Sequence, residues 1–73
     1  MAKSKHITGE DLTKRERQVL HLISLGHPSL EASRIMKVNK RTVDFHLLNA
    51  YDKLGVSNRV QAINKARELG IVQ

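Results

Sequence analysis

The chain has 73 residues, enough for one small domain. It has no cysteine, so this domain is stabilised without disulfides or thiolate-bound metal. Thirteen Lys and Arg residues against seven Asp and Glu give a net charge of +6, which fits either a protein that binds a polyanion or a basic protein kept soluble by its charge. No apolar run is long enough to span a membrane, and Phe45 and Tyr51 are too few aromatics for a single-strand or RNA stacking platform. We therefore expect a soluble cytoplasmic protein.

The first helix is predicted to begin near Thr13. Residues 1–11 lack hydrophobic periodicity and are predicted to form a flexible lead-in, which leaves residues 12–73 for the domain. Thr13 can cap the helix, Glu16 can complete a capping box, and a glycine at position 26 ends the pattern. The expected inward-facing residues are Val19, Leu20, Ile23 and Leu25.

A second, shorter helix should follow the turn that contains Pro28. Either Ser29 caps this helix or Pro28 occupies its first position, where the missing N–H costs nothing. Its apolar residues are Leu30, Ala32, Ile35 and Met36. An end near Val38 leaves three or four residues before the next helix, which is the spacing of a helix-turn-helix.

The third helix is predicted between Asn39, an N-cap residue type, and Gly55, a helix-stop residue. At about 100° per residue it has three faces. The expected core stripe consists of Val43, Leu47, Ala50 and Leu54. One flank of the stripe is a polar row, Thr42, His46, Asn49 and Lys53. The outer face carries Arg41, Asp44, Phe45 and Leu48, an unusual mixture for a solvated surface.

The last helix is predicted from Arg59 to about Leu69, with Asn58 and Gln61 repeating the capping-box pattern. Ala62, Ala66 and Leu69 can face the core, which leaves Val60 and Ile63 as a strip that is either exposed or buried in the monomer. The β-branched residues are scattered and never alternate over four positions, so no strand is expected. The predicted fold class is all-α with four helices.

Several short motifs occur in order along this framework. They are Leu12-Thr13-x-Arg15-Glu16, Thr42-Val43-x-x-His46, Lys53-Leu54-Gly55-Val56, and the later Arg59, Ala62, Ala66 and Gly70-Ile71. With this spacing the chain resembles the DNA-binding domain of the LuxR/FixJ family of bacterial transcription regulators. Residues 42–50 are most similar to the autoinducer-binding, quorum-sensing branch. The resemblance implies a LuxR-type helix-turn-helix domain with the third helix as recognition helix, acting as the effector part of a transcription regulator.

In the major groove, base-edge contacts specify the sequence and phosphate contacts position the protein. The predicted base-reading residues are Lys40, Arg41, Asp44, Phe45 and Leu48. The predicted phosphate-contacting residues are Thr42, His46, Asn49, Lys53 and Arg59; the resemblance supports Thr42, His46 and Lys53 in that role. Three alternatives stay open: Asp44 merely pairs with Lys40, Phe45 belongs to the core, and His46 bonds a backbone carbonyl.

Similar domains pair through the fourth helix, which would make Val60, Ile63 and Arg67 the dimerisation residues of a weak homodimer on a palindromic site. No catalytic, metal-binding or phosphate-cradling arrangement is visible, so we expect no enzyme activity, cofactor, membrane contact or small-molecule ligand. Arg15 either pairs with Glu31, which is the preferred expectation, or contacts the DNA backbone. The alternative function is a helical adaptor that contacts the transcription machinery, such as RNA polymerase, without reading sequence.

Overall fold

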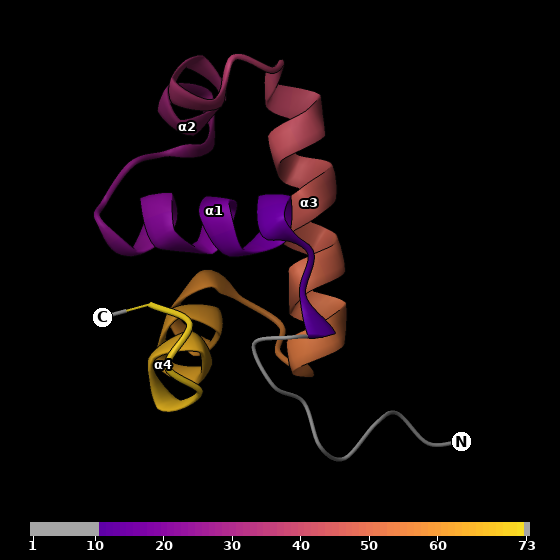
Figure 1. Ribbon diagram of the computed structural model, residues 1–73, viewed down its shortest axis with the longest axis vertical. Coiled ribbons are helices and arrows are strands. Elements are labelled where there is room, and N and C mark those ends of the chain that lie inside the picture. Colours follow the sequence, from indigo (N-terminus) through magenta and orange to yellow (C-terminus); the bar gives the residue numbers. More distant parts are fainter. Residues whose placement is uncertain (1–10, 73) are drawn as a thin grey trace.

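The computed structural model describes residues 11–72 and contains four helices in this range (Figure 1). They are α1 (Lys14–Ser24), α2 (Ser29–Met36), α3 (Lys40–Leu54) and α4 (Arg59–Glu68). No strand occurs between residues 11 and 72, so the all-α prediction with four helices is confirmed. The predicted lead-in lies outside the described residues, apart from its last position.

Three of the four helices begin with the caps that the sequence predicts. The Thr13 hydroxyl accepts the Glu16 N–H at 3.1 Å, while the Glu16 carboxylate accepts the Thr13 N–H at 2.9 Å. The Asn39 side chain accepts from Thr42 N–H, and the Asn58 side chain accepts from Gln61 N–H. These bonds satisfy N–H groups that have no partner within the helix, so each start is fixed by local chemistry.

The start of α2 differs from both predicted alternatives. Pro28 is the N-cap, with extended backbone at φ −70° and ψ 165°, and Ser29 is the first helical residue. No side chain caps this helix. The Pro28 carbonyl accepts the Ala32 N–H at 2.9 Å and so begins the helical ladder from outside the helix. Proline suits this position because its fixed φ is compatible with the extended conformation of an N-cap.

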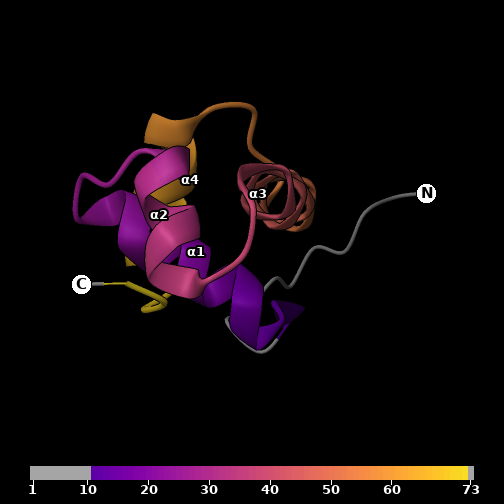
Figure 2. The ribbon, with the colours of Figure 1, turned by 90° about the horizontal axis from the view of Figure 1, so that it is seen from above.

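α1 lies across α3, and the two views show that α2 and α4 also cross α3 steeply (Figures 1 and 2). The core between the helices contains the predicted stripe of α3, which is buried along its whole length. The other core residues are Leu12, Val19, Leu20, Leu22, Ile23, Ala32, Met36, Ala62, Ala66 and Val72. Burial of this apolar surface is the main force that holds α3 against α1 and α2.

Three large apolar residues at the end of α1 and on α2 are exposed: Leu25, which was expected to face the core, and Leu30 and Ile35. Leu25 follows the last residue of α1 as its C-cap, beyond the reach of the amphipathic pattern. On α2 the buried face consists of Ser29, Ala32, Ser33 and Met36. Small residues on that face allow close helix contact, which turns the larger Leu30 and Ile35 outward.

The turn between α2 and α3 has three residues, as a helix-turn-helix requires. Lys37 ends α2 in the left-handed conformation, at φ 61° and ψ 43°. Its N–H donates to the Arg34 carbonyl, and the Val38 N–H donates to the Ser33 carbonyl at 3.0 Å. A lysine rarely adopts this conformation, so the turn carries local strain that glycine would relieve.

Candidate nucleic-acid interface

The outer face of α3 is open to solvent along its middle. Arg41 is exposed, and Phe45 and Leu48 are 60% and 64% exposed. The alternative in which Phe45 belongs to the core is therefore wrong. Because the opposite side of α3 is buried, this face is the side on which the helix can be covered by a partner. A cation and two large apolar groups are thus presented together on one rigid element.

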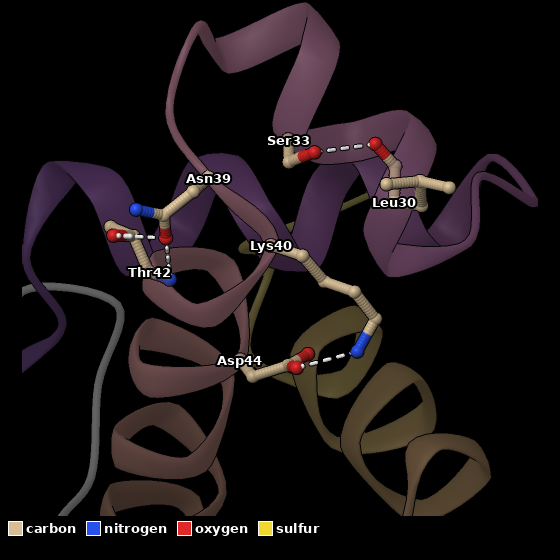
Figure 3. Close-up of polar contacts among 6 residues, drawn as sticks. All are labelled: Leu30, Ser33, Asn39, Lys40, Thr42 and Asp44. Carbon is tan, nitrogen blue, oxygen red and sulfur yellow. Dashed lines mark hydrogen bonds and ion pairs between the residues drawn. The ribbon is translucent and has the colours of Figure 1, made fainter.

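Asp44 and Lys40 form an ion pair on one edge of this face. The Lys40 ammonium lies 2.8 Å from the Asp44 carboxylate, one helical turn away, and both side chains are well exposed. Figure 3 shows the pair on the opposite side of α3 from Asn39 and Thr42. The hydrogen bond from Lys40 is the main cause that lowers the pKa of Asp44; burial opposes it, and Ser29, the charge of Lys40 and the charge of Arg59 lower the pKa further.

The contributions of Ser29 and Arg59 show which elements surround Asp44. Ser29 opens α2 and Arg59 opens α4, so the starts of three helices contribute to the surroundings of one carboxylate. The alternative in which Asp44 pairs with Lys40 describes the free protein correctly. A role for Asp44 or Lys40 in reading bases stays a prediction, and it requires this exposed pair to open or to contact DNA together.

The polar row lies along the other edge of the face, and its four members are all partly buried. Both donors of Thr42 are used locally, since its N–H and hydroxyl reach the Asn39 side chain at 2.8 and 2.9 Å. The His46 ring meets the Phe45 ring edge-on, with centroids 5.8 Å apart. Within residues 11–72 no hydrogen bond from the His46 ring to a backbone carbonyl is found, and the role of His46 stays a prediction.

Lys53, the last member of the polar row, is held by a residue that lies far away in the sequence. Its ammonium is 2.8 Å from the Glu16 carboxylate in α1, and Glu16 is only 4% exposed while Lys53 is 36% exposed. The sequence predicted Glu16 as a cap and Lys53 as a phosphate contact, but gave no signal that the two would meet. Contact between DNA phosphate and Lys53 stays a prediction.

The Glu16 carboxylate is stabilised from two directions at once. Burial by itself would raise its pKa, but the hydrogen bond and charge of Lys53, together with the bonds from Thr13, outweigh burial and lower the pKa below its ordinary value. One oxygen, Oε1, accepts from both Lys53 and the Thr13 N–H. The α1 cap and the C-terminal end of α3 are thereby joined at a single atom.

The expected pair between Arg15 and Glu31 is absent from the described structure. Arg15 donates to Gln18, one turn along α1, at 3.4 Å, whereas Glu31 lies 2.7 Å from the His27 ring. Both partners are therefore satisfied within their own segments. The contact between α1 and α2 depends instead on apolar packing around the buried Ala32 and Met36.

The surface of α4 fits the predicted dimerisation strip only in part. Val60 is 67% exposed, while Ile63 is half-buried and packs against the core. Arg67 is exposed on the same side of the helix. Ala62 and Ala66 are buried as predicted, so α4 attaches to the domain through its small residues and leaves Val60 outside.

The described residues contain no group of acidic, His or Cys side chains that could hold a metal ion. None of the four helices is long and apolar enough to cross a membrane. The candidate functional features within residues 11–72 are the exposed face of α3, its two polar edges and the surface of α4.

Comparison with known protein families decides how this arrangement is classified. Residues 10–66 match the model of the family described as bacterial regulatory proteins, luxR family. The chain belongs to this family. Over 65 residues it is 43% identical to the transcriptional activator protein LuxR of Aliivibrio fischeri, covering 89% of this chain and 26% of that protein. It is 37% identical over all 73 residues to the quorum sensing-dependent regulator RpaR of Rhodopseudomonas palustris, covering 30% of that protein.

Solved structures give the same result. The transcription factor GerE superimposes with a TM-score of 0.81 at 37% identity, covering 85% of this chain and 92% of GerE. The Vibrio cholera VqmA-ligand-DNA complex gives a TM-score of 0.78 at 25% identity, covering 97% of this chain and 30% of that one. The four helices therefore form a LuxR-type helix-turn-helix DNA-binding domain, and the similarity to the quorum-sensing branch is confirmed.

The LuxR-type chain spans only about a quarter to a third of the curated relatives that it matches. The family match covers α1, α2 and α3 completely and α4 as far as Ala66. Every residue assigned to α3 therefore lies within the match. The relatives are transcription regulators rather than enzymes. The roles of individual side chains do not follow from the family match and have to be argued from the geometry described above.

Proposed function

We propose that this domain binds specific sequences of double-stranded DNA, with the N-terminal half of α3 in the major groove. The observation that supports this best is the exposed face of α3, where Arg41, Phe45 and Leu48 project from a helix that is buried along its opposite side. The major groove admits an α-helix and presents both hydrogen-bonding groups and thymine methyl groups. The net charge of +6 favours approach to such a polyanion.

Within this arrangement Arg41 has the clearest base-reading role. Its guanidinium is exposed in the first turn of α3, and it can donate two hydrogen bonds to a guanine in the major groove. Asp44 can accept from a cytosine amino group while Lys40 turns to a nearby phosphate. Phosphate contacts come from the polar row on one edge of the face and from Arg59 at the start of α4. The first N–H groups of α3 add a favourable dipole for an anion.

We further propose that two copies bind a palindromic site through the exposed surface of α4. Val60 is the most exposed apolar residue of this surface, and Ile63 and Arg67 follow it along the helix. Helix-turn-helix dimers place their recognition helices about one turn of DNA apart, roughly 34 Å. Because one exposed valine and its neighbours offer little apolar area, the isolated dimer is weak and DNA supplies much of the association energy.

As a LuxR-family domain that spans a fraction of its relatives, the chain acts as the effector part of a cytoplasmic bacterial transcription regulator. The relatives are named as transcriptional activators or quorum sensing-dependent regulators. RNA polymerase is a proposed second partner once the domain is bound to DNA. The exposed Leu25, which follows the last residue of α1, is a candidate contact for it.

Selection of bound sites from random duplex DNA tests the proposal. The expected result is an enriched motif with two inverted half-sites, and the variant Arg41→Ala should lose the preference at one position of each half. A helical adaptor that does not read sequence would enrich no motif. Titration with salt adds a second criterion, because the three proposed phosphate-facing cations, Lys40, Lys53 and Arg59, imply that log affinity per copy falls with log salt at a slope of roughly −3. A flat dependence contradicts DNA binding.

A further inference from the structure

Phe45 and Leu48 form an apolar pair at the centre of the exposed face of α3. They are three residues apart, so their side chains are neighbours on the helix surface. They are 60% and 64% exposed, among the largest values of any large apolar residue in the described chain. Water contact with two such groups is unfavourable, and their position on the proposed DNA-facing side implies an apolar partner there.

The Phe45 ring also has a defined orientation. The His46 ring packs against it edge-on, with an interplanar angle of 61° and centroids 5.8 Å apart. Edge-to-face packing of this kind favours one arrangement over others. The ring is therefore partly ordered before any partner arrives, which reduces the conformational entropy lost when it binds.

The surroundings of the pair decide which partner fits. Exposed Arg41 lies one turn before Phe45, and the Lys40–Asp44 ion pair borders the patch on one side. A protein interface needs roughly 1,000 Å² of buried surface, far more than two side chains within a charged frame provide. On DNA, by contrast, the apolar group that projects into the major groove is the C5 methyl of thymine.

On the basis of the proposed DNA binding, we propose that Phe45 and Leu48 read thymine methyl groups at adjacent base pairs. Residues three apart are separated by about 4.5 Å along the helix axis, close to the roughly 3.4 Å rise between base pairs. The operator half-site then contains two thymines, on one strand or on both, beside the base that Arg41 contacts. The apolar pair thus makes methyl groups a determinant of specificity.

Replacing thymine by deoxyuridine tests this directly, because the change removes the methyl and leaves every hydrogen-bonding group in place. Fluorescence anisotropy with the duplex obtained by random selection gives the affinity. Each substitution at a contacted thymine is expected to weaken binding of the unmodified domain about fourfold. With Leu48→Ala or Phe45→Ala, the affinity should drop and the deoxyuridine effect at one of the two positions should disappear.

The exposed Leu25, at the end of α1, offers a matched control, and Leu25→Ala should keep the full deoxyuridine effect. If the domain binds its selected site but ignores every thymine-to-deoxyuridine change, methyl reading is refuted while DNA binding stands. If random selection yields no motif at all, sequence-specific DNA binding itself is refuted, and methyl reading is refuted with it. If Phe45→Ala and Leu48→Ala leave DNA affinity unchanged, the pair serves another partner and the inference is overturned.

Discussion

The ion pair between Lys53 and Glu16 makes the sharpest prediction about stability. Lys53→Met removes the ammonium but keeps most of the apolar stem, so the buried Glu16 carboxylate loses its charged partner. Breaking a fully buried pair costs about 3–5 kcal/mol. Lys53 is 36% exposed and the Thr13 N–H continues to bond Glu16, so we expect a loss of about 2 kcal/mol.

Urea denaturation followed by circular dichroism measures this loss. A domain of this size has a free energy of unfolding of roughly 4–10 kcal/mol. In a small domain this free energy falls by about 1 kcal/mol for each 1 M urea, so a loss of about 2 kcal/mol lowers the urea midpoint by about 2 M. Lys65 provides the matched control, because it pairs with Glu68 at 3.5 Å on the open surface of α4. Lys65→Met should cost less than about 0.5 kcal/mol.

The pH dependence identifies the cause of the loss. The pKa of Glu16 is lowered in the folded protein, so its contribution is present above the unfolded value near 4.5 and disappears as pH falls through the folded value. As the pH falls through the lowered pKa of Glu16 and the carboxylate becomes neutral, the difference between Lys53→Met and the unmodified domain should shrink. A loss that stays the same from pH 7 to the lowest pH at which both proteins fold, or a loss no greater than that of Lys65→Met, would refute the argument.

Three further predictions concern α3, the turn before it and α4. Asp44→Ala should change the preferred base at one position of the selected site more than it changes total affinity, whereas uniform weakening across all sequences would refute its reading role. Val60→Glu should reduce binding to a palindrome more than binding to a half-site, and equal losses would contradict pairing through α4. Lys37→Gly should raise stability by about 0.5–1 kcal/mol in thermal unfolding, since it relieves the left-handed conformation at φ 61°; a lower melting temperature would count against strain there.

The helices and their caps could be predicted because their signals are local. Asn39 and Thr42, like Thr13 and Glu16, lie three residues apart, and the bonds between them depend on little else. The core stripe of α3 follows from the helical period alone, and Gly55 ends that helix in the left-handed conformation that glycine adopts without penalty.

Contacts between helices were not predictable in the same way. Glu16 and Lys53 are 37 residues apart, and no sequence rule relates two charges at such a distance. The same limit explains why the predicted pair between Arg15 and Glu31 is wrong. Arg15 bonds Gln18 and Glu31 bonds His27, so each side chain has a partner near it in the sequence. On α2, the small Ala32 set how closely the helix packs and so which apolar residues turned outward.

Of the candidate site, the division of α3 into faces was predictable, and the state of its polar side chains was not. Periodicity placed Phe45 and Leu48 on the outer face, where the structure finds them exposed. The pairing of Asp44 with Lys40 was one of two open alternatives, because side chains four residues apart on a helix meet only when no better partner is present.

The central claim is that the exposed face of α3 contacts DNA, and titration of the isotope-labelled domain with its selected duplex tests it most directly by NMR. The largest shift changes are predicted at Arg41, Phe45 and Leu48, with smaller changes along the polar row. The resonances of Leu25, exposed at the end of α1, should move little. Changes concentrated at Leu25, with Phe45 and Leu48 unaffected, would contradict the account.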